Sequence, residues 1–481
     1  DKRLCFTLYL CTPKLKEMKQ FVFLWMAVIL PFCAMAQEVL TLEQCRQLAI
    51  ANNKELKVAG KLVDKAKEER HAARTKYFPQ VSAVGTYIRN SKDIELVDYS
   101  KFSSLSSITA PMLQKFPELG LILPQVMEKM KDATHLDIRN VWIGDVSLVQ
   151  PVFMGGKIVS YNQITTYARE LAESMHDTKL QDVICRTDET YWQVVSLANK
   201  KKLADAYVDL LRKMDTDVAA MITAGVATKA DELSVKVKLN EAEMAQTKVN
   251  NGLALSRMLL AQLCGLDMEH PPLLADERIE QFAVQPTATQ ANAEEAFSHR
   301  PELKSLELAT KIYRKKEQIA LAEMLPTVAL TANYLVTNPN TYHGFKKEFS
   351  GMYNVGVLVR VPLSAWWEGS YKRNAARAET VIKRLETEEA REKVELQVNQ
   401  SVYKVNEASK QLTASTRNME RAEENLRYAN VGFEEGVIPA LNLMEAQTAW
   451  VSARSQLIDA QIEVKLTEVY LSKALGRLGK E

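Results

Sequence analysis

The amino-acid sequence predicts a mostly helical α+β fold with an internal two-fold repeat. Three observations support this prediction. Between Pro151 and Pro271 the chain has no proline and consists mainly of strong helix formers, which indicates long helices. The second half of the chain repeats the order of the prolines and glycines that punctuate the first half. After Pro79, and again after Pro326, the apolar residues change from a helical period to a period of two, which indicates strands.

The composition limits the classes of function that the chain can serve. The 481 residues carry a formal net charge of +2, so the chain lacks the basic excess of a nucleic-acid-binding protein and no nucleic-acid partner is expected. No internal segment approaches the run of about 18 apolar residues that a transmembrane helix needs, which excludes a bundle of such helices. A membrane β-barrel stays open as an alternative, because its strands alternate apolar and polar residues.

The N-terminal region has the features of a secretory signal peptide. A charged start at residues 18–20 leads into the apolar segment 21–33, and Ala34-Met35-Ala36 supplies a small-residue cleavage motif. We therefore predict an upstream extension over residues 1–17 and a signal peptide over residues 18–36. The alternative is an N-terminal membrane anchor, which the short apolar segment disfavours.

Cleavage after this segment would leave three of the six cysteines, namely Cys45, Cys185 and Cys264. They are odd in number, far apart in the sequence and set within helical patterns, so they suggest neither a disulfide framework nor a metal site. We interpret them as small packed side chains. Lipid attachment at Cys33 is disfavoured, because the preceding Pro31-Phe32 lacks the small residues of a lipidation site.

Self-comparison defines the repeat. The segment 49–79 aligns without gaps on the segment 296–326. Three further pairs of residues align: Pro151 with Pro362, Gly225 with Gly436, and Gly265 with Gly476. We therefore predict a first repeat over residues 37–266, a proline-containing linker over 267–287 and a second repeat over 288–481.

Each repeat is expected to begin with a helix that a proline ends. In the first repeat, Thr41 and Gln44 form a capping box at the helix start. The helical pattern continues to about Tyr77, with a break at Asn52-Asn53, and Pro79 ends it.

Two strands follow in each repeat. We predict them at about residues 80–90 and 140–150 in the first repeat, and at about 327–336 and 351–361 in the second. Apolar residues occupy one face of every strand. Polar residues occupy the other face, among them Asp145, Asn333 and Arg360.

Aromatic residues lie toward the loop-side ends of these strands: Tyr87, Trp142, Tyr334 and Tyr353. Strands of this length with an apolar face, a polar face and an aromatic rim are typical of a transmembrane β-barrel. The alternative is a pair of soluble β-hairpins packed on helices. The occurrence of the pattern twice, behind a signal peptide, favours the barrel.

Long helices follow the strands. We predict one helix from about residue 157 to a reversal at Gly225, and a second helix back to about Leu263. At 1.5 Å per residue, the first would be on the order of 100 Å long. A second antiparallel pair follows Pro362 and reverses at Gly436.

Four strands per chain cannot close a barrel, because about eight are the minimum and about 12 leave an open lumen. The chain must therefore assemble with copies of itself, and three copies would supply about 12 strands. The helices are charged around much of their circumference, as in residues 417–424, which suits a wall with water on both sides better than a solid core.

These features together resemble the TolC family of outer-membrane efflux channels. The signal peptide, the repeat and the order of strand, proline, glycine and long helix span the mature chain. The segments that carry the resemblance are 151–156, 224–227, 263–265, 435–438 and 474–476.

The resemblance implies a homotrimer in the outer membrane of a Gram-negative cell. The strands of three chains would form one β-barrel in the outer-membrane lipid, and their long helices would form a coiled-coil α-barrel in the periplasm. The additional residues of the first repeat would lie in an extracellular loop, with 110–130 as an amphipathic helix. The resemblance also implies a periplasmic adaptor (membrane fusion) protein and an inner-membrane pump as partners.

The resemblance further implies where the site residues lie. Gly225 and Gly436 would form the periplasmic tip turns, and acidic residues just after these turns would line a constriction. The matching positions are Asp231, Asn442 and Glu445. Asn442 stands where an acid is common, which weakens a tight anionic ring. The alternative for these three is an ordinary solvated helix face.

The strand-to-helix junctions are the last predicted feature. They are expected at Pro151, Gly155 and Gly156 in the first repeat and at Pro362 in the second. The second junction departs from the family pattern, because residues 364–369 lack the paired glycines.

The sequence shows no pattern that indicates catalysis. Gly155-Gly156-Lys157 is similar to the end of a phosphate-binding loop, but Pro151 stands where that motif needs a glycine. The histidines are scattered without the spacing of metal ligands, and no catalytic pair of a nucleophile and a base can be recognised. We therefore predict no enzymatic activity, no catalytic residue, no cofactor and no metal site.

The predicted function is a passive outer-membrane duct for efflux or type I export, opened at its tip by the adaptor and the pump. The alternative is a structural or adaptor-like periplasmic coiled-coil protein without a membrane barrel.

Overall fold

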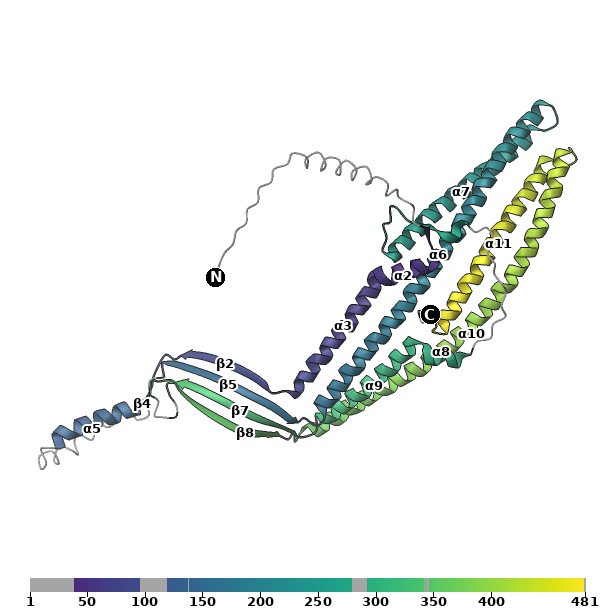
Figure 1. Ribbon diagram of the computed structural model, residues 1–481. Coiled ribbons are helices and arrows are strands. Elements are labelled where there is room, and N and C mark those ends of the chain that lie inside the picture. Colours follow the sequence, from purple (N-terminus) through teal and green to yellow (C-terminus); the bar gives the residue numbers. More distant parts are fainter. Residues whose placement is uncertain are drawn as a thin grey trace, which may run out of the picture. The chain divides into compact units, whose positions relative to one another are not determined.

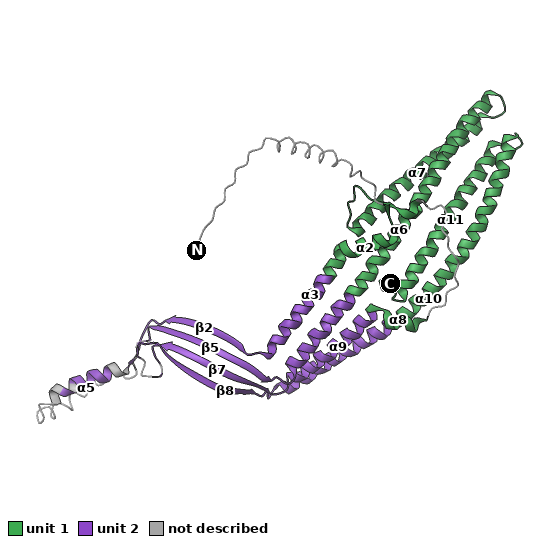
Figure 2. Cartoon of the chain, viewed as in Figure 1, with its two compact units in different colours: residues 1–59, 176–301, 391–481 green, residues 60–175, 302–390 purple. Residues whose placement is uncertain are grey.

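The computed structural model describes residues 39–95, 119–136, 138–278, 292–340, 342 and 346–479. The predicted upstream extension and signal peptide lie outside the described residues, as does the second part of the predicted linker. The chain forms two compact units, each made of separate stretches of sequence (Figure 2). Unit 1 contains residues 1–59, 176–301 and 391–481, and unit 2 contains residues 60–175 and 302–390.

Unit 2 contains a four-stranded antiparallel sheet. Its strands follow the order β2, β5, β7, β8 (Figure 1). They span Gln80–Arg89, Asn140–Phe153, Thr327–Asn338 and Ser350–Arg360. The central pair, β5 and β7, joins the two halves of the chain, so the two hairpins form one continuous sheet.

Strand β5 extends through Pro151, which the sequence placed at the junction with the helix. Pro151 still pairs with Ala329, and the register shifts before Phe153. A proline is tolerated inside a sheet at such a bulge, because the ladder is already irregular there. The junction itself therefore falls at Met154-Gly155-Gly156.

The register of the sheet places the predicted apolar positions on one face. Val81 lies opposite Leu148, which lies opposite Ala332, which lies opposite Val355. Because side chains alternate along a strand, the neighbouring positions fall on the other face. That face carries polar residues, Ser82, Ser147, Asn333 and Asn354 in one row and Asp145 and Arg360 in others, interspersed with apolar ones such as Val84 and Leu335.

Short connections hold the helices of unit 2 at the base of the sheet. Gly155 has φ of 61°, and a Cβ there would lie 2.8 Å from the carbonyl oxygen of Ala322. Only glycine fits both the left-handed backbone and this close approach. Ala322 is the last residue of helix α9 (Pro301–Ala322). Lys157, which starts the helix that follows Gly155, binds Glu323 just after α9, with 3.0 Å between Nζ and Oε1.

The additional residues of the first half contain a helix, α5 (Leu119–Thr134). It is flanked by the short strands β3 (Ile94–Glu95) and β4 (His135–Leu136), which pair with each other. Within the described residues, the predicted helix at 110–130 is helical from Leu119 onward and continues past Met130 to Thr134. Residues 96–118 lie outside the described residues.

The remaining elements are mainly helices, four of them long. Helix α6 spans Lys157–Thr223, α7 spans Lys229–Cys264, α10 spans Ala365–Glu434 and α11 spans Ala440–Ala474. The first two form one antiparallel hairpin and the last two form another (Figure 1). The predicted mostly helical α+β class is thus confirmed. No described helix combines the length with the apolar character that crossing a bilayer requires.

Unit 1 also contains shorter helices, the first of which packs against the end of α7. Helix α2 (Leu42–Asn52) begins with the predicted capping box between Thr41 and Gln44. Asn53 separates it from α3 (Lys54–Arg74), because its side-chain oxygen accepts hydrogen bonds from the amides of Glu55 and Leu56 and so starts the next helix. Helix α8 (Ala293–His299) precedes α9.

Candidate functional site

The two helical hairpins reverse at glycines with left-handed backbone conformations. Gly225 has φ of 79° and Gly436 has φ of 71°. In each turn the amide after the glycine donates to a carbonyl five residues earlier, at 2.9 Å for Val226 and 2.7 Å for Val437. This is the Schellman motif, and both hairpins use it.

Asp231 caps the helix that leaves the first turn. Its carboxylate accepts from the amide of Thr228 at 2.8 Å, and its own amide donates to the Thr228 hydroxyl at 3.3 Å. The Thr228 hydroxyl also donates to this carboxylate at 2.6 Å, and its hydrogen bond, together with that from the Thr228 amide, lowers the pKa of Asp231. Asp231, predicted to line the constriction, therefore stabilises the start of its own helix, α7 (Lys229–Cys264). The spacing Thr-x-x-Asp, a capping box, is the signal in the sequence that indicates it.

The second hairpin differs at the matching positions. Pro439 stands where the first hairpin has Thr228, and it provides no side-chain cap. Asn442 donates its amide to the carbonyl of Pro439 at 3.1 Å. Asn442 and Glu445 are both exposed, whereas Leu443 and Met444 between them are buried. The side chains of Asn442 and Glu445 therefore share the face of α11 that points away from the core.

A buried apolar cluster joins the two hairpins near their turns. Its members come from all four long helices: Met214, Val218, Val235, Ala429, Ala440, Leu443, Met444 and Ala446. Because the turn glycines carry no side chain, this cluster holds the hairpin ends together by packing.

An apolar groove lies between α7 and α11 beside this cluster. It encloses about 730 Å³ and is lined mainly by Leu233, Val237, Leu441 and Met444, with Lys238 and Glu445 among its polar members. The first three of these side chains are half exposed or more. An exposed apolar groove with charges at its edge is typical of a protein-binding surface.

Two polar contacts also connect the hairpins. Lys200 of α6 binds Asp459 of α11, with 2.6 Å between Nζ and Oδ1. Tyr207 of α6 and Thr448 of α11 share a hydrogen bond of 3.1 Å between their hydroxyl oxygens. Both contacts lie at the surface, where water can replace the lost partner. They can therefore break without exposing buried apolar residues.

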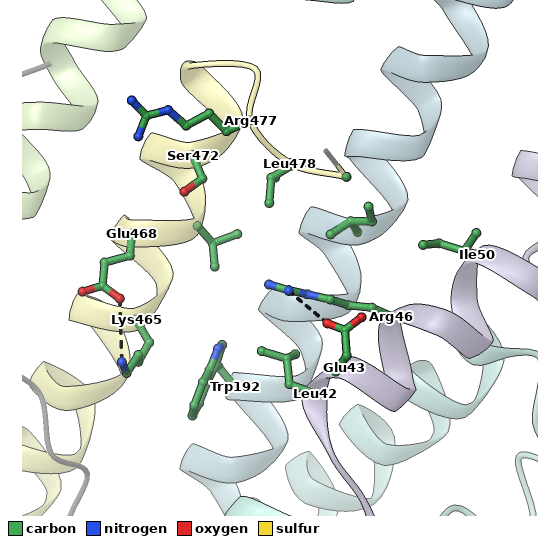
Figure 3. Close-up of a pocket in the computed structure, with 13 residues that line it drawn as sticks. Leu42, Glu43, Arg46, Ile50, Trp192, Lys465, Glu468, Ser472, Arg477 and Leu478 are labelled. Carbon is green, nitrogen blue, oxygen red and sulfur yellow. Dashed lines mark hydrogen bonds and ion pairs between the residues drawn. The ribbon is translucent and has the colours of Figure 1, made fainter. Parts of the chain in front are cut away.

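A second cavity, of about 400 Å³, lies in unit 1 between α2, α6 and α11 (Figure 3). Its cations already have partners. Arg46 binds Asp188, Lys465 lies 3.7 Å from Glu468, and the Arg477 guanidinium forms two hydrogen bonds with Glu295. We interpret this cavity as structural. Among the described residues, no group of three or more His, Cys, Asp or Glu could hold a metal ion.

The sheet brings the predicted rim aromatics together in two pairs. Tyr87 and Trp142 are opposite each other, with ring centroids 4.5 Å apart. Tyr334 and Tyr353 are also opposite each other. All four lie on the apolar face of the sheet.

A second aromatic group, not among the residues expected from the sequence, lies at the other end of the strands. Trp366, Trp367 and Tyr371 lie at the start of α10, just after β8, and are exposed. Two adjacent tryptophans beside the expected junction at Pro362 are the signal that would have identified them.

The chain matches the family model described as outer membrane efflux protein over residues 45–266 and 292–477. It is 20% identical to outer membrane protein TolC of Escherichia coli (strain K12) over 392 residues, which cover 79% of this chain and 78% of that protein. It is 22% identical to protein CyaE of Bordetella pertussis over 312 residues, 64% of this chain and 65% of that protein.

The fold is similar to those of solved channels. For the outer-membrane channel OprN the TM-score is 0.71 at 16% identity, covering 90% of this chain and 89% of that one. For the open state of the MtrE outer membrane channel of Neisseria gonorrhoeae it is 0.69 at 16% identity, covering 90% and 88%. At these identities the likeness concerns the fold.

Proposed function

Because this chain belongs to the outer membrane efflux protein family, we propose that it is the passive duct of a tripartite efflux or type I export system. The family comprises outer-membrane efflux channels rather than enzymes, and this membership places the chain in the outer membrane. Energy for transport would come from an inner-membrane pump, and a periplasmic adaptor would open the duct at its tip.

The open sheet supports a trimeric β-barrel. Within the described residues, neither β2 nor β8 pairs with a strand on its outer side. Edge strands of 10 and 11 residues leave many backbone groups without partners, and a bilayer offers none. Pairing of β2 with β8 of the next copy satisfies both edges. Three copies give about 12 strands, enough for a lumen.

The two faces of the sheet support its placement in lipid. The face with Val81, Leu148, Ala332 and Val355 would contact the outer-membrane lipid, and the polar face would line the lumen. The rim pairs Tyr87–Trp142 and Tyr334–Tyr353 would mark one membrane interface. Trp366 and Trp367 would mark the other.

The long helices would form the periplasmic α-barrel. The same order of strands, long helix, glycine turn and shorter helix in both halves supports the two-fold repeat over 37–266 and 288–481. The exposed residues along α10 include many charged side chains, which suits a wall between two aqueous spaces.

The tip turns at Gly225 and Gly436 would be the gate. Asn442 and Glu445 are our candidates for the constriction, because both are exposed on one face of α11. Asp231 would contribute mainly by capping α7.

Conductance and oligomeric state test the proposal together. We expect protein extracted from outer membranes with detergent to be a trimer by native mass spectrometry, and to form ion-conducting channels in a planar bilayer. A monomer that stays in solution without detergent and conducts no ions would instead establish the alternative, a structural or adaptor-like periplasmic coiled-coil protein.

A further inference from the structure

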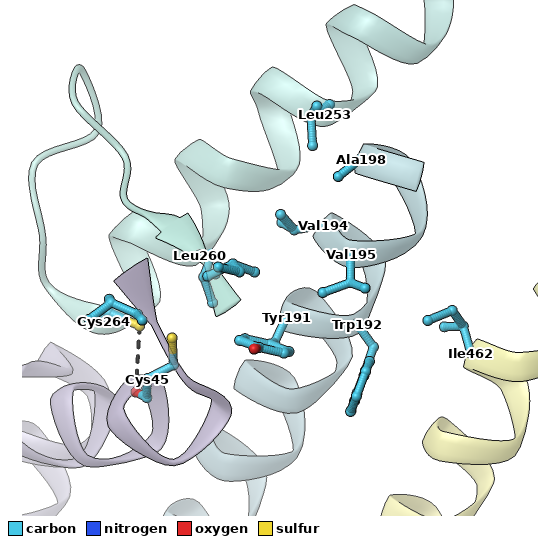
Figure 4. Close-up of a cluster of buried hydrophobic side chains, with 12 residues drawn as sticks. Cys45, Tyr191, Trp192, Val194, Val195, Ala198, Leu253, Leu260, Cys264 and Ile462 are labelled. Atoms are coloured by element: carbon cyan, nitrogen blue, oxygen red, sulfur yellow. Dashed lines mark hydrogen bonds between the residues drawn. The ribbon is translucent and has the colours of Figure 1, made fainter. Parts of the chain in front are cut away.

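Helix α2 packs against the end of α7, within unit 1. Two-residue strands guide the contact, since β1 (Val39–Leu40) pairs in parallel with β6 (Leu273–Leu274). Cys45 of α2 and Cys264, the last residue of α7, meet there (Figure 4). Both are completely buried, and the Sγ atom of Cys264 lies 3.5 Å from the carbonyl oxygen of Cys45.

Hydrogen bonds hold the backbones around the two cysteines in place. The side chain of Asn52 donates to the carbonyl oxygen of Cys264 at 3.2 Å, and that of Asn53 donates to Leu263 at 3.4 Å. A Cβ at Gly265 would lie 2.5 Å from the Cβ of Asn52, so the backbones are in close contact. The cysteines are thus presented by two packed helix segments rather than by loops.

Both cysteines are free thiols in the structure, and Cys264 influences the thiol of Cys45. Hydrogen bonding with Cys264, together with burial, raises the pKa of the Cys45 thiol far above its ordinary value. Cys185 provides a contrast within the same unit. It is also buried, but its thiol donates to the carboxylate of Glu189 at 3.5 Å, and burial is the main cause that raises its pKa to about 12.

We propose that Cys45 and Cys264 form a disulfide bond in the mature protein, while Cys185 remains a free thiol. This proposal rests on the proposed function, which places unit 1 in the periplasm, an oxidising compartment. It revises our interpretation of these two cysteines as merely packed side chains. The bond would close a loop between residues that are 219 positions apart.

The bond would form by thiol–disulfide exchange with the disulfide of an external thiol oxidoreductase. The thiolate of one cysteine attacks that disulfide, forms a mixed disulfide and displaces one of its sulfurs. The second cysteine then loses its proton, attacks the mixed disulfide and completes the S–S bond. Two electrons and two protons pass to the oxidant, which leaves as a dithiol. Because both cysteines are buried in the fold, exchange must precede the closure of α2 over α7.

The bond would fix the end of α7 that lies farthest from its turn. Helix α7 starts at Lys229, next to the tip, and ends at Cys264. A covalent link to α2 would hold the far end while the tip half of α7 stays free to move.

Peptide-level alkylation tests the proposal. Outer membranes are prepared with a maleimide present, and the protein is denatured without reductant and labelled again. We expect label on Cys185, none on Cys45 or Cys264, and a cross-linked peptide pair that reductant separates. Cys45→Ser should expose Cys264 to label, and Cys264→Ser should expose Cys45. The matched variant Cys185→Ser should leave the cross-link unchanged.

Full labelling of Cys45 and Cys264 in the unreduced wild-type protein would overturn the proposal, as would a link between two chains. Bilayer conductance is measured on the same preparation. A conducting channel whose three thiols are all labelled refutes only the disulfide, whereas loss of conductance with an intact cross-link refutes only the duct.

Discussion

Asp188 is a completely buried acid in the middle of α6. Its two carboxylate oxygens accept from Nε and Nη2 of Arg46, each at 2.8 Å. Burial raises the pKa of Asp188 in spite of this pairing, because its side chain has no exposed surface. Arg46 keeps part of its surface in water, and the hydrogen bond to Asp188 raises its pKa. The arginine therefore compensates a carboxylate that the fold has removed from solvent.

We predict that Arg46→Met will lower the free energy of unfolding by about 3–5 kcal/mol at neutral pH, because it leaves an unpaired buried charge. The pKa of Asp188 is raised in the folded state, so the loss should shrink as pH falls through that raised value and the carboxyl becomes neutral. Urea unfolding of the detergent-solubilised protein across pH measures this. The double variant Arg46→Met, Asp188→Asn is the control and should lose less. A loss that does not vary with pH would contradict the prediction.

At the residue scale, the sequence supplied candidate positions, and their role in a constriction stays a prediction. It identified 231, 442 and 445 by register, but it missed that Asp231 closes a capping box with Thr228. That signal is local and can be read from the sequence. The contact of Cys45 with Cys264 is different, because it depends on the packing of α2 against α7 and no local pattern reports it.

The turns that join the long helices need glycine for its backbone conformation rather than for its small size. Gly225 is left-handed, and a Cβ there would meet no atom within 4 Å. Substitution therefore tests backbone strain without steric clash.

We predict that Gly225→Ala will lower the free energy of unfolding by roughly 1–2 kcal/mol, the cost of a left-handed residue with a side chain. Gly60, in the middle of α3, also has open space around its Cβ but a helical backbone. Gly60→Ala should therefore raise stability by about 0.5–1 kcal/mol. Urea unfolding should show changes of opposite sign in the free energy of unfolding of the two variants. A change of the same sign in both would refute this account of the turn.

The contacts between the hairpins should control opening. Asp459→Asn removes the partner of Lys200. We predict a higher open probability in bilayers, because one tie between α6 and α11 is lost. Asp209→Asn is the matched control, since Asp209 is exposed and pairs with Arg212 of its own helix. Equal conductance of both variants and the wild type would rule out this contact as part of the gate.

At the element scale, the absence of proline between Pro151 and Pro271 and the many strong helix formers there together predicted α6 and α7, and Gly225 located their reversal. Strand β5 was predicted less well. Its continuation to Phe153 depends on pairing with β7, and the sequence around Pro151 alone indicates a strand end.

The assembly should respond differently to changes on the two faces of one strand. Val355 lies in the middle of β8 on the apolar face, and Asn354 beside it lies on the polar face. We predict that Val355→Lys will abolish or strongly reduce trimer formation, because on the proposed lipid-facing side a lysine would cost about 2–4 kcal/mol per copy near the midplane.

Asn354→Lys is the matched control and should assemble normally, because its side chain would face water in the lumen. Heat-modifiable migration of the outer-membrane fraction on a gel measures assembly. Normal trimers of both variants would show that this sheet does not cross the membrane.

At the scale of the whole molecule, the α+β class and the family were predictable from order and repetition. The division into two compact units was not predictable, because unit 1 combines three separate stretches of the sequence and unit 2 combines two. Residues such as Gly60 and Met175 fall at unit boundaries within continuous helices, where no change of composition marks them.

The two unpaired edges of the sheet also have a genetic consequence. They are different strands, so each copy would join its neighbours head to tail, and one faulty edge would leave the ring unclosed. A chain with a damaged β8 keeps a sound β2 and can still occupy a place beside normal copies. Expressed in equal amounts with the wild type, it would leave only about one trimer in eight free of the defect. Such an allele should therefore be dominant, and the amount of intact trimer in the outer membrane of a strain that carries both alleles would reveal it.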